Sequence, residues 1–341
     1  MPALAELDEL CDTVARARAV APIGGRTHWE VGGPPPTGDD VVLVRAPSGV
    51  VTYDPADLTV TVGAGTRCGE LAALLAVDGQ ECALDPRDPD ATVGGLLATG
   101  LSGRRRLRHG PLRDRVLEVR FVNADGRVVK GGGPTVKNVT GFDLPRLLVG
   151  SLGTIGVMVQ VTVRCEPLPA VAEWFATDAD PFAVRAALYR PSCIAWDGTR
   201  TRVLLEGVRA DVEAERAAIP GACTTAAAPT GPDGAHRGRI SVRPSALAAL
   251  GDALDRAGVR WSAEVGVGTV HVAGDDEVAL AGARAAAVDR GGWLLREAGA
   301  PALDGFGRDL PSPRLSARVR AAFDPAGKFS PGRLPTEAVD G

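Results

Sequence analysis

The sequence of 341 residues lacks features that mark several common classes of protein. It contains no apolar run of about 18 residues, the length that a membrane-spanning helix needs. Its first residues are acidic, whereas a signal peptide begins with basic residues followed by apolar ones. Lysine and arginine do not outnumber aspartate and glutamate, so no excess of positive charge favours nucleic acid. We therefore expect a cytoplasmic protein that does not bind nucleic acid.

Residues suited to metal binding and acid–base chemistry are also scarce. The six cysteines include no C-x-x-C pair, which argues against a zinc or iron–sulfur site and favours reduced, mostly buried thiols. Only four histidines and two tyrosines offer a base other than a carboxylate. The Gly-x-Gly-x-x-Gly fingerprint of nicotinamide-binding folds is absent from every strand-to-helix turn that we can place.

Glycine, in contrast, is abundant and concentrated. Four glycines lie between Ala91 and Arg106, and a further pair, Gly24 and Gly25, follows a short apolar strand over 20–23. Glycine allows backbone conformations and close approaches that other residues do not. Successive amides exposed in this way can bind an anion, and nearby arginines can add charge-assisted hydrogen bonds to a phosphate. The alternative for 91–106 is a flexible, basic surface loop.

Hydrophobic periodicity predicts an alternation of helices and strands. Helices are expected over 4–19, 68–77, 144–148, 181–190, 209–218, 245–257 and 275–290. Strands are expected over 41–45, 49–53, 58–62, 116–122, 127–130, 157–163, 203–206, 260–265, 268–273 and 293–297. The stretch 220–238, rich in Ala, Thr, Gly and Pro, is expected to be a mobile loop. This pattern favours an α+β protein with an antiparallel sheet in its second half.

Several motifs occur in an order that resembles one flavoprotein family. They are 89–95 (PDATVGG), 100–105 (GLSGRR), 108–110 (RHG), 136–143 (VKNVTGFD) and 150–157 (GSLGTIGV). Residues 20–170 are similar to the FAD-binding domain of the vanillyl-alcohol oxidase and p-cresol methylhydroxylase type. Within that family the resemblance is closest to the FAD-binding subunit of bacterial glycolate oxidase. A shorter likeness covers 323–334 (FDPAGKFSPGRL).

The resemblance implies a fold and a division into domains. We expect an FAD-binding domain of two subdomains over 1–170, of the vanillyl-alcohol oxidase type. A smaller α+β domain with an antiparallel sheet would follow over 171–310. A C-terminal segment, 311–341, would return to the FAD-binding domain.

The resemblance also implies which residues bind FAD. A first phosphate loop would contain Ile23, Gly24, Gly25, Arg26, Thr27 and His28. A mid-chain set would contain Thr92, Val93, Gly94, Gly95, Thr99, Gly100, Ser102, Gly103, Arg108, Gly110 and Asp114. A third set, on the adenine and pyrophosphate side, would contain Gly153, Ile155, Gly156 and Val157.

Two positions in the first loop depart from the family pattern. Arg26 stands where the family often has a third glycine, although a guanidinium beside a pyrophosphate is chemically reasonable. Some relatives attach FAD covalently through a histidine that aligns with Thr27, so we expect non-covalent FAD. The adjacent His28 has an alternative role, packing near Trp29.

The implied function is that of an FAD-binding subunit in a glycolate (2-hydroxy-acid) oxidase or dehydrogenase complex. Its partners would be a larger flavoprotein subunit and an iron–sulfur subunit, and any membrane association would run through these partners. A self-contained FAD-dependent oxidoreductase acting on an alcohol or hydroxy acid is one alternative. A flavin-free assembly subunit that keeps the fold is another, favoured by Arg26 and by Ser330, where relatives commonly carry Asn.

A complete substrate site is not expected from the sequence. Oxidation of a hydroxy acid needs a base for the hydroxyl proton and a cation for the carboxylate. No acid–base constellation is evident in the second half, and His271, alternating on a strand, is expected to be packed or at the surface. Catalytic residues are therefore left unassigned.

Overall fold

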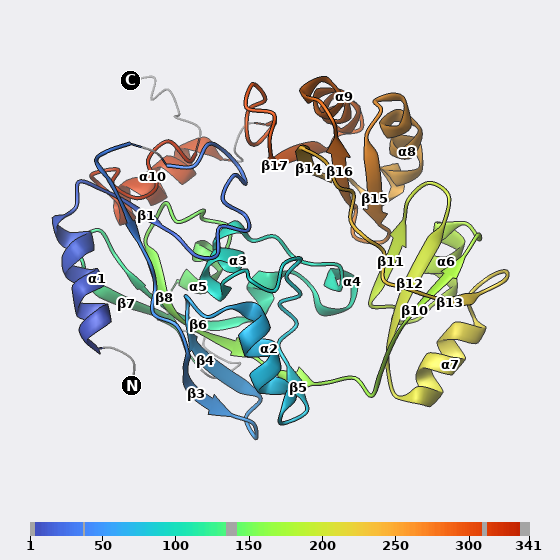
Figure 1. Cartoon of the computed structure of the whole chain (residues 1–341), viewed down its shortest axis with the longest axis horizontal. Helices are drawn as coiled ribbons and strands as arrows, with labels where there is room; N and C mark the ends of the chain where they lie inside the picture. Colours follow the sequence, from blue (N-terminus) through green and yellow to red (C-terminus); the bar gives the residue numbers. More distant parts are fainter. Residues whose placement is uncertain (1–3, 37, 134–141, 309–311, 335–341) are drawn as a thin grey trace.

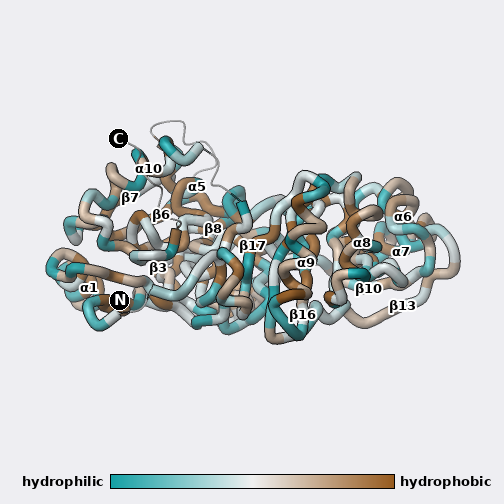
Figure 2. The backbone as a smooth tube through the Cα atoms, turned by 90° about the horizontal axis from the view of Figure 1, so that it is seen from above, coloured by the Kyte–Doolittle hydropathy of each residue, from teal (hydrophilic) through white to brown (hydrophobic). Residues whose placement is uncertain are grey.

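Two sheets, built from separate halves of the chain, organise the molecule. The computed structural model describes residues 4–36, 38–133, 142–308 and 312–334. The two halves lie side by side along its longest axis, with α1 (Leu4–Arg16) at one end and α6 (Pro181–Ala187) and α7 (Arg209–Ala217) at the other (Figures 1 and 2). Most of the predicted motif 136–143 lies outside the described residues.

The first half contains an antiparallel five-stranded sheet. Its order is β3 (Val50–Asp54), β4 (Thr59–Gly63), β8 (Val157–Arg164), β6 (Val116–Val122) and β7 (Val128–Gly132). The central β8 is buried at six of its eight residues, because both faces of the sheet are covered. One face packs against α2 (Cys68–Ala76) and α3 (Val93–Thr99), the other against α1. The helix α5 (Leu144–Leu148) packs into the same hydrophobic core as α2 and α3.

A small parallel pair completes this half. Strand β1 (Ala19–Pro22) pairs with β2 (Val41–Val44), and the chain between them forms the first glycine loop. The C-terminal segment also reaches β1: Phe329 lies beside Val20 in a parallel bridge, and Ser330 N donates to Val20 O at 2.7 Å. Figure 1 shows the red helix α10 (Pro313–Phe323) beside the blue strand β1.

The second half is an antiparallel eight-stranded sheet covered by helices on one face. Its order is β13 (Thr224–Ala226), β10 (Val171–Thr177), β12 (Thr201–Gly207), β11 (Cys193–Trp196), β15 (Arg260–Glu264), β16 (Thr269–Gly274), β14 (His236–Ser241) and β17 (Trp293–Ala298). Helices α6, α7, α8 (Leu247–Arg256) and α9 (Glu277–Val288) bury apolar residues such as Ile240 and Leu294. Because side chains alternate along strands, the other side chains of these strands lie on the opposite face of the sheet. That face is turned toward the first half.

The predicted α+β class with an antiparallel sheet is confirmed, and most predicted elements are present. The prediction of a loop over 220–238 was wrong at 224–226 and 236–238, which are strands, whereas 227–235 is irregular. β13 pairs with the edge of β10, and β14, which starts at His236, lies between β16 and β17. The sequence also missed β10, β11, α3 and α10. The domain limits 1–170, 171–310 and 311–341 stay predictions. All six cysteines are free, and Cys68, Cys165 and Cys193 are buried.

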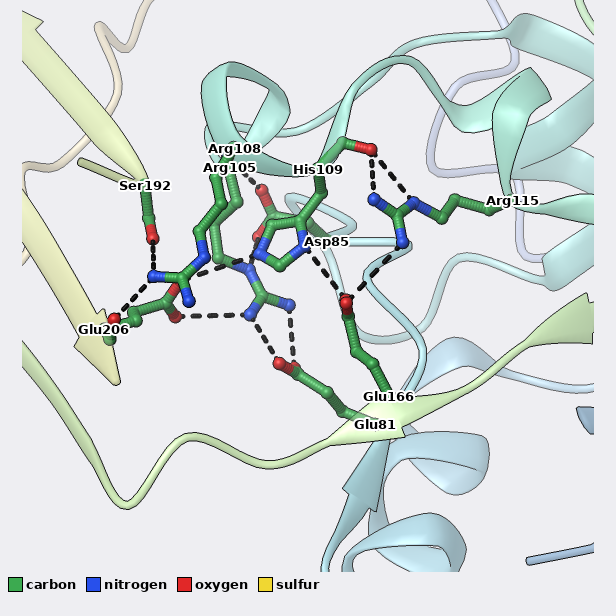
Figure 3. A network of polar contacts seen from close by, with 9 residues as sticks. All are labelled: Glu81, Asp85, Arg105, Arg108, His109, Arg115, Glu166, Ser192 and Glu206. Carbon is green, nitrogen blue, oxygen red and sulfur yellow. Dashed lines mark hydrogen bonds and ion pairs between the residues drawn. The ribbon is translucent and has the colours of Figure 1, made fainter. Parts of the chain in front are cut away.

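An ionic network joins the second sheet to the first half (Figure 3). Arg105, just before α4 (Arg106–His109), reaches both sides: Nη2 lies 2.8 Å from Oε2 of Glu81, and Nη1 lies 3.2 Å from Oε1 of Glu206. Glu81 belongs to β5 (Gln80–Glu81), which pairs with β9 (Glu166–Pro167), and Glu206 belongs to β12. His109 Nδ1 lies 2.9 Å from Glu166 Oε1, and its Nε2 lies 3.7 Å from Glu206 Oε2.

The network shifts the ionisation of His109, Glu166 and Glu206 toward their charged forms. Burial alone would lower the pKa of His109, but contacts with Glu166 and Glu206 raise it overall. Burial would raise the pKa of Glu206, but His109, Ser192 and Arg105 lower it to about 2. The pKa of Glu166 is also lowered, since His109 and Arg115 outweigh burial. The network is therefore a stabilising element whose strength depends on pH.

Replacing His109 should remove a contribution to stability that is greatest in mildly acidic solution. A histidine with a raised pKa stabilises the fold fully below its unfolded value of about 6.5 and loses this effect as pH rises through the folded value. The carboxylates lose theirs only in stronger acid, because their pKa values are lowered. In urea unfolding, His109→Gln should therefore fall further below wild type at pH 6 than at pH 9.

The exposed Glu213→Gln in α7 serves as a control and should match wild type at both pH values. An equal deficit for His109→Gln at pH 6 and pH 9 would show that the His109 ion pairs contribute nothing to stability.

A buried lysine attaches the C-terminal segment to the first half. Lys328 is 9 % exposed, and its Nζ donates to Val14 O at 2.9 Å and Ala124 O at 3.0 Å.

Lys328→Met keeps the apolar stem but leaves both carbonyls without this donor, which should cost about 2 kcal/mol or more. The melting temperature should fall by several degrees, whereas the exposed Arg16→Met should leave it unchanged. A Lys328→Met protein that melts with wild type would contradict this account.

Candidate functional site

The first and mid-chain glycine motifs meet in space. A Cβ on Gly24 would lie 2.1 Å from Thr92 Oγ1, and one on Gly25 would lie 2.3 Å from the carbonyl oxygen of Asp90. Thr92 itself caps α3, where its Oγ1 accepts a hydrogen bond from Gly95 N. The loop after β1 therefore presses directly on the turn that begins α3, and only glycine permits this approach.

The loop offers a row of free backbone donors. The amides of residues 24–28 donate no hydrogen bond to any residue that the structure describes, although Ile23 N and Trp29 N on either side are bonded. Arg26 has φ of 60°, a left-handed conformation that glycine adopts most easily. This explains why related loops carry glycine at the position of Arg26. Successive free amides in such a turn form a concavity suited to an anion.

A cleft lies over this loop and over the start of α3. Nine of the predicted FAD-binding residues line it: Gly24, Gly25, Arg26, Thr27, His28, Thr92, Gly95, Thr99 and Gly153. The C-terminal segment contributes two more, Ser330 and Arg333. Ser330 Oγ donates to Gly153 O at 3.1 Å, so the serine found where relatives have Asn still ties this segment to the third glycine motif.

Arg333 brings a buried positive charge to the cleft. It is 6 % exposed, and among the described residues no carboxylate pairs with it. Its Nη1 donates to Pro34 O at 3.2 Å, and its guanidinium lies 5.7 Å from the ring centre of Trp29. Arg26 contacts the same ring at 6.0 Å. Burial, together with Arg296, lowers the pKa of Arg333 to about 10.

These features fit a diphosphate. Within the described residues, Arg333 has no acidic partner and the amides of 24–28 donate to no acceptor, so together they have the donors and charge that a phosphate group needs. Sequence reasoning missed Arg333, although the motif 323–334 contains it. Burial lowers the pKa of His28, so its ring is expected to contribute as a neutral group.

Other predicted residues shape the cleft without lining it. Val93, Ile155 and Val157 are buried in the hydrophobic core. Gly94 is a packing glycine, because its Cβ would lie 2.9 Å from Ala64 and its amide already donates to Ala64 O. Gly100 ends α3 in a left-handed conformation. The remaining members of this group are Ser102, whose Oγ accepts from Leu112 N, and Gly156, which packs on Phe121.

Three predicted residues lie away from the cleft. Arg108 donates to the backbone of Glu206 and to Ser192 Oγ in the second half (Figure 3). Asp114 pairs with Arg146 at 3.1 Å, and Gly110 lies beside Asp114. The structure therefore does not bring Arg108, Gly110 or Asp114 together with the first loop. The role of every predicted residue in FAD binding stays a prediction.

A larger cavity of about 640 Å³ adjoins the cleft, because Thr27 and His28 line both. One side comes from the first half, with Asp85–Asp88 and Gly103–Arg105, and the other from the open face of the eight-stranded sheet. Its volume lies within the range of about 300–1,000 Å³ that is typical of small-molecule sites. Trp174 and Leu204 give the wall an apolar part.

Charged residues gather in this wall because of strand alternation. In β16, His271 points away from the core that contains Val270 and Val272, and it lies opposite Arg239 of β14. His271 Nε2 lies 2.6 Å from Glu264 Oε1 of β15. Arg87 contacts His271 Nδ1 and extends the cluster into the first half. Its Nη1 donates to Glu297 Oε2 at 2.9 Å.

The expectation that the second half holds no acid–base constellation was therefore wrong. His271 is packed, as expected, but beside a carboxylate and a guanidinium rather than among apolar side chains alone. The residues come from positions 87, 264, 271 and 297, which no short motif can reveal. The usable signal was the polar alternation of the strands that carry them.

Glu264 has the properties of a group that exchanges protons near neutral pH. Burial raises its pKa to about 7, although Arg239 and Arg87 partly offset this effect. Its Oε2, and the Oε1 of Glu297, have no hydrogen-bond partner among the described residues. A carboxylate that titrates near neutrality beside cations can accept a proton from a bound hydroxyl group.

Two features are absent from the described part of the chain. There, no three His, Cys, Asp or Glu side chains gather as a metal ion would require. No helix within 4–36, 38–133, 142–308 and 312–334 is long and apolar enough to cross a membrane.

Comparison with known proteins agrees with the geometry of the cleft. Residues 3–132 match a family described as an FAD binding domain. The glycolate oxidase subunit GlcE of Escherichia coli (strain K12) is 40% identical over 139 residues, covering 40% of this chain and 39% of that protein. The D-lactate dehydrogenase of Archaeoglobus fulgidus is 37% identical, covering 42% and 32%. The glycolate oxidase subunit GlcD of Bacillus subtilis is 32% identical, covering 44% and 32%.

The chain thus matches less than two-fifths of the length of each of these relatives. A solved structure of alkyldihydroxyacetonephosphate synthase matches far more of the chain, with a TM-score of 0.69 over 95% of this chain and 74% of that one. Its sequence identity is 15%, so it shows the fold alone.

These comparisons confirm the resemblance to FAD-binding flavoproteins and FAD as the predicted cofactor. By sequence, residues 3–132 therefore match the FAD binding domain family, within a chain whose fold resembles that of alkyldihydroxyacetonephosphate synthase.

Proposed function

We propose that the chain is the FAD-binding subunit of a complex that oxidises a 2-hydroxy acid such as glycolate. The observation that carries this proposal is one cleft shared by the loop 24–28, whose amides donate to no described residue, and by the buried Arg333, which has no carboxylate partner among the described residues. The loop lies within the segment that matches an FAD binding domain. Relatives named as glycolate oxidase subunits and as D-lactate dehydrogenases support the substrate class.

The chain's own residues would hold the cofactor by its pyrophosphate. The amides of 24–28 would donate to phosphate oxygens, and Arg26 and Arg333 would balance their charge. Thr27 stands where some relatives carry a linking histidine, so FAD would be held without a covalent bond. Bound FAD supplies the acceptor for the two electrons of an alcohol oxidation.

The same proposal extends to partners and location. We expect a larger flavoprotein subunit and an iron–sulfur subunit in the complex, and we expect the complex in the cytoplasm.

One observation favours a second function, that of a self-contained oxidoreductase: the cavity beside the cleft contains Glu264, His271 and four arginine side chains. The free amides weigh against a flavin-free assembly subunit.

The colour of the purified protein tests the proposal first. We expect yellow protein whose FAD is released by heat and remains in the supernatant after acid precipitation. Colourless protein that takes up no added FAD would refute the FAD-binding function, and flavin that stays in the acid precipitate would refute non-covalent binding.

Anaerobic mixing with glycolate or D-lactate then separates the two functions. Bleaching by the chain alone supports the self-contained oxidoreductase, and bleaching only with co-purified partners supports the subunit.

Removing the charge of Arg333 should weaken FAD binding. A charge-assisted hydrogen bond contributes about 1.5–3 kcal/mol, so Arg333→Gln should raise the dissociation constant for FAD at least ten-fold. Flavin fluorescence quenching measures this constant in apoprotein. Arg333→Lys keeps the charge and should recover part of the loss. Arg209→Gln, on the exposed α7, should bind FAD like wild type. If Arg333→Gln also bound like wild type, Arg333 would not contact the cofactor.

A further inference from the structure

Two of the free cysteines, Cys82 and Cys165, lie against each other and form what we call the thiol pair. Cys82 directly follows β5, Cys165 directly precedes β9, and their Sγ atoms are 3.6 Å apart. Cys165 is 1 % exposed, whereas Cys82 is half-buried. In the described part of the chain, no other hydrogen bond joins two thiols. Neither residue lines the cleft or the large cavity, so the thiol pair needs an explanation of its own.

The register of the two strands places these cysteines directly opposite each other. β5 and β9 are antiparallel, with Glu81 opposite Glu166. One position further along each strand, Cys82 therefore lies opposite Cys165. Side chains that are opposite in an antiparallel pair point to the same face of the sheet, which explains why the two sulfurs meet.

The hydrogen bonding of this ladder makes the cysteines a close pair. Leu168 N donates to Gly79 O at 2.8 Å, so residues 79 and 168 form a hydrogen-bonded pair. Hydrogen-bonded and non-hydrogen-bonded pairs alternate along antiparallel strands, and this alternation makes Cys82 and Cys165 a non-hydrogen-bonded pair. The Cα atoms of such a pair are about 4.5 Å apart, within the range of roughly 4.4–6.8 Å that a disulfide spans. Rotation of the side chains can therefore join the sulfurs without moving the strands.

The contact between the thiols also favours their oxidation. When Cys82 donates, its hydrogen bond lowers the pKa of Cys165 and outweighs burial, which acts in the opposite sense. The thiolate is the reactive form of cysteine. Hydrogen peroxide is a suitable oxidant, because it is small enough to reach a nearly buried sulfur.

The reaction would proceed in two steps. The Cys165 thiolate attacks one oxygen of the peroxide, the O–O bond breaks, and hydroxide leaves a sulfenic acid on Cys165. The Cys82 thiolate then attacks that sulfur, the S–O bond breaks, and a second hydroxide leaves. The two thiol protons convert both hydroxides to water. Two electrons pass from the sulfurs to the peroxide, so two thiols and one peroxide give one disulfide and two waters.

The bond would form where the chain crosses between the halves. β9 ends at Pro167, and the chain then continues to β10 of the second sheet (Figure 1). Without the bond, β9 is held to the first half by a pairing of only two residues, and those residues also contribute to the ionic network. Glu81 pairs with Arg105 at 2.8 Å, and Glu166 pairs with His109 at 2.9 Å. A disulfide beside both carboxylates would hold them in register.

We propose that Cys82 and Cys165 are a disulfide site, oxidised by hydrogen peroxide, and that the bond fastens the crossing segment to the first half. The proposal goes beyond the proposed function and does not depend on bound FAD.

Counting thiols in the full chain tests whether the bond forms. The protein is treated with hydrogen peroxide, then with catalase, and is alkylated with iodoacetamide in guanidinium chloride. Untreated protein should take up six alkyl groups by mass spectrometry, one for each cysteine, and treated protein should take up four. Tryptic mapping should show the peptide that begins at Cys165 linked to Cys82, with Cys68 alkylated. Dithiothreitol should restore all six thiols.

Thermal unfolding tests what the bond does. Because a disulfide that closes a long loop restricts the unfolded chain, oxidised wild type should melt about 3 °C or more above the reduced protein. Dithiothreitol should abolish the difference. Cys82→Ser should give no linked peptide and no rise in melting temperature. The matched control Cys11→Ser, in α1, should form the bond and gain stability like wild type. Should Cys82→Ser fail to fold, the linked peptide of wild type still decides whether the bond forms.

Two results would overturn the proposal. One is wild type that keeps six alkylatable thiols in peroxide, or loses them only to sulfinic and sulfonic acids or to other cysteine pairs. The other is oxidised wild type that contains the linked peptide but melts with the reduced protein, which would show that the bond fastens nothing.

Discussion

The close approach of Gly24 and Gly25 to the turn that begins α3 is the constraint on which the site depends. With side chains at these positions, the loop would have to move away from Thr92 and Asp90. The free amides of 24–28 would then no longer lie beside the residues that α3 contributes to the cleft. The same loop borders the larger cavity through Thr27 and His28, so its position also determines how the cleft and the cavity connect.

Two ionic clusters lie between the halves of the molecule, and they differ in how fully their charges are paired. Around Arg105, the carboxylates of Glu81, Asp85 and Glu206 form ion pairs with the guanidinium, and His109 lies near Glu206. This cluster contributes to the relative position of the halves. Around His271, in contrast, two carboxylate oxygens have no donor within the described part of the chain, and Arg237 is only weakly paired there. Incomplete pairing is costly to stability, and this cost is typical of sites that bind ligands.

The sequence predicted the parts of the structure that depend on local patterns. Hydrophobic periodicity located most helices and strands, and the glycine motifs led to the FAD binding family. It missed α3, since glycines at positions 94 and 95 disfavour a helix and the Thr92 cap was not recognised. It also missed the charged wall, because residues such as Arg87, Glu264 and His271 are far apart in the sequence and meet only when the chain is folded. Arg108 and Asp114 were assigned from motif order, but the chain turns away from the cleft before reaching them.

The C-terminal segment has a consequence for how the protein is made. Ser330 and Arg333 line the cleft, and Phe329 pairs with Val20 from the opposite end of the sequence. During synthesis, the first half can collapse around its own sheet while this wall of the cleft is still missing. The cleft is complete only when residue 333 has left the ribosome, so full-strength cofactor loading waits for this segment instead of accompanying the folding of the first half.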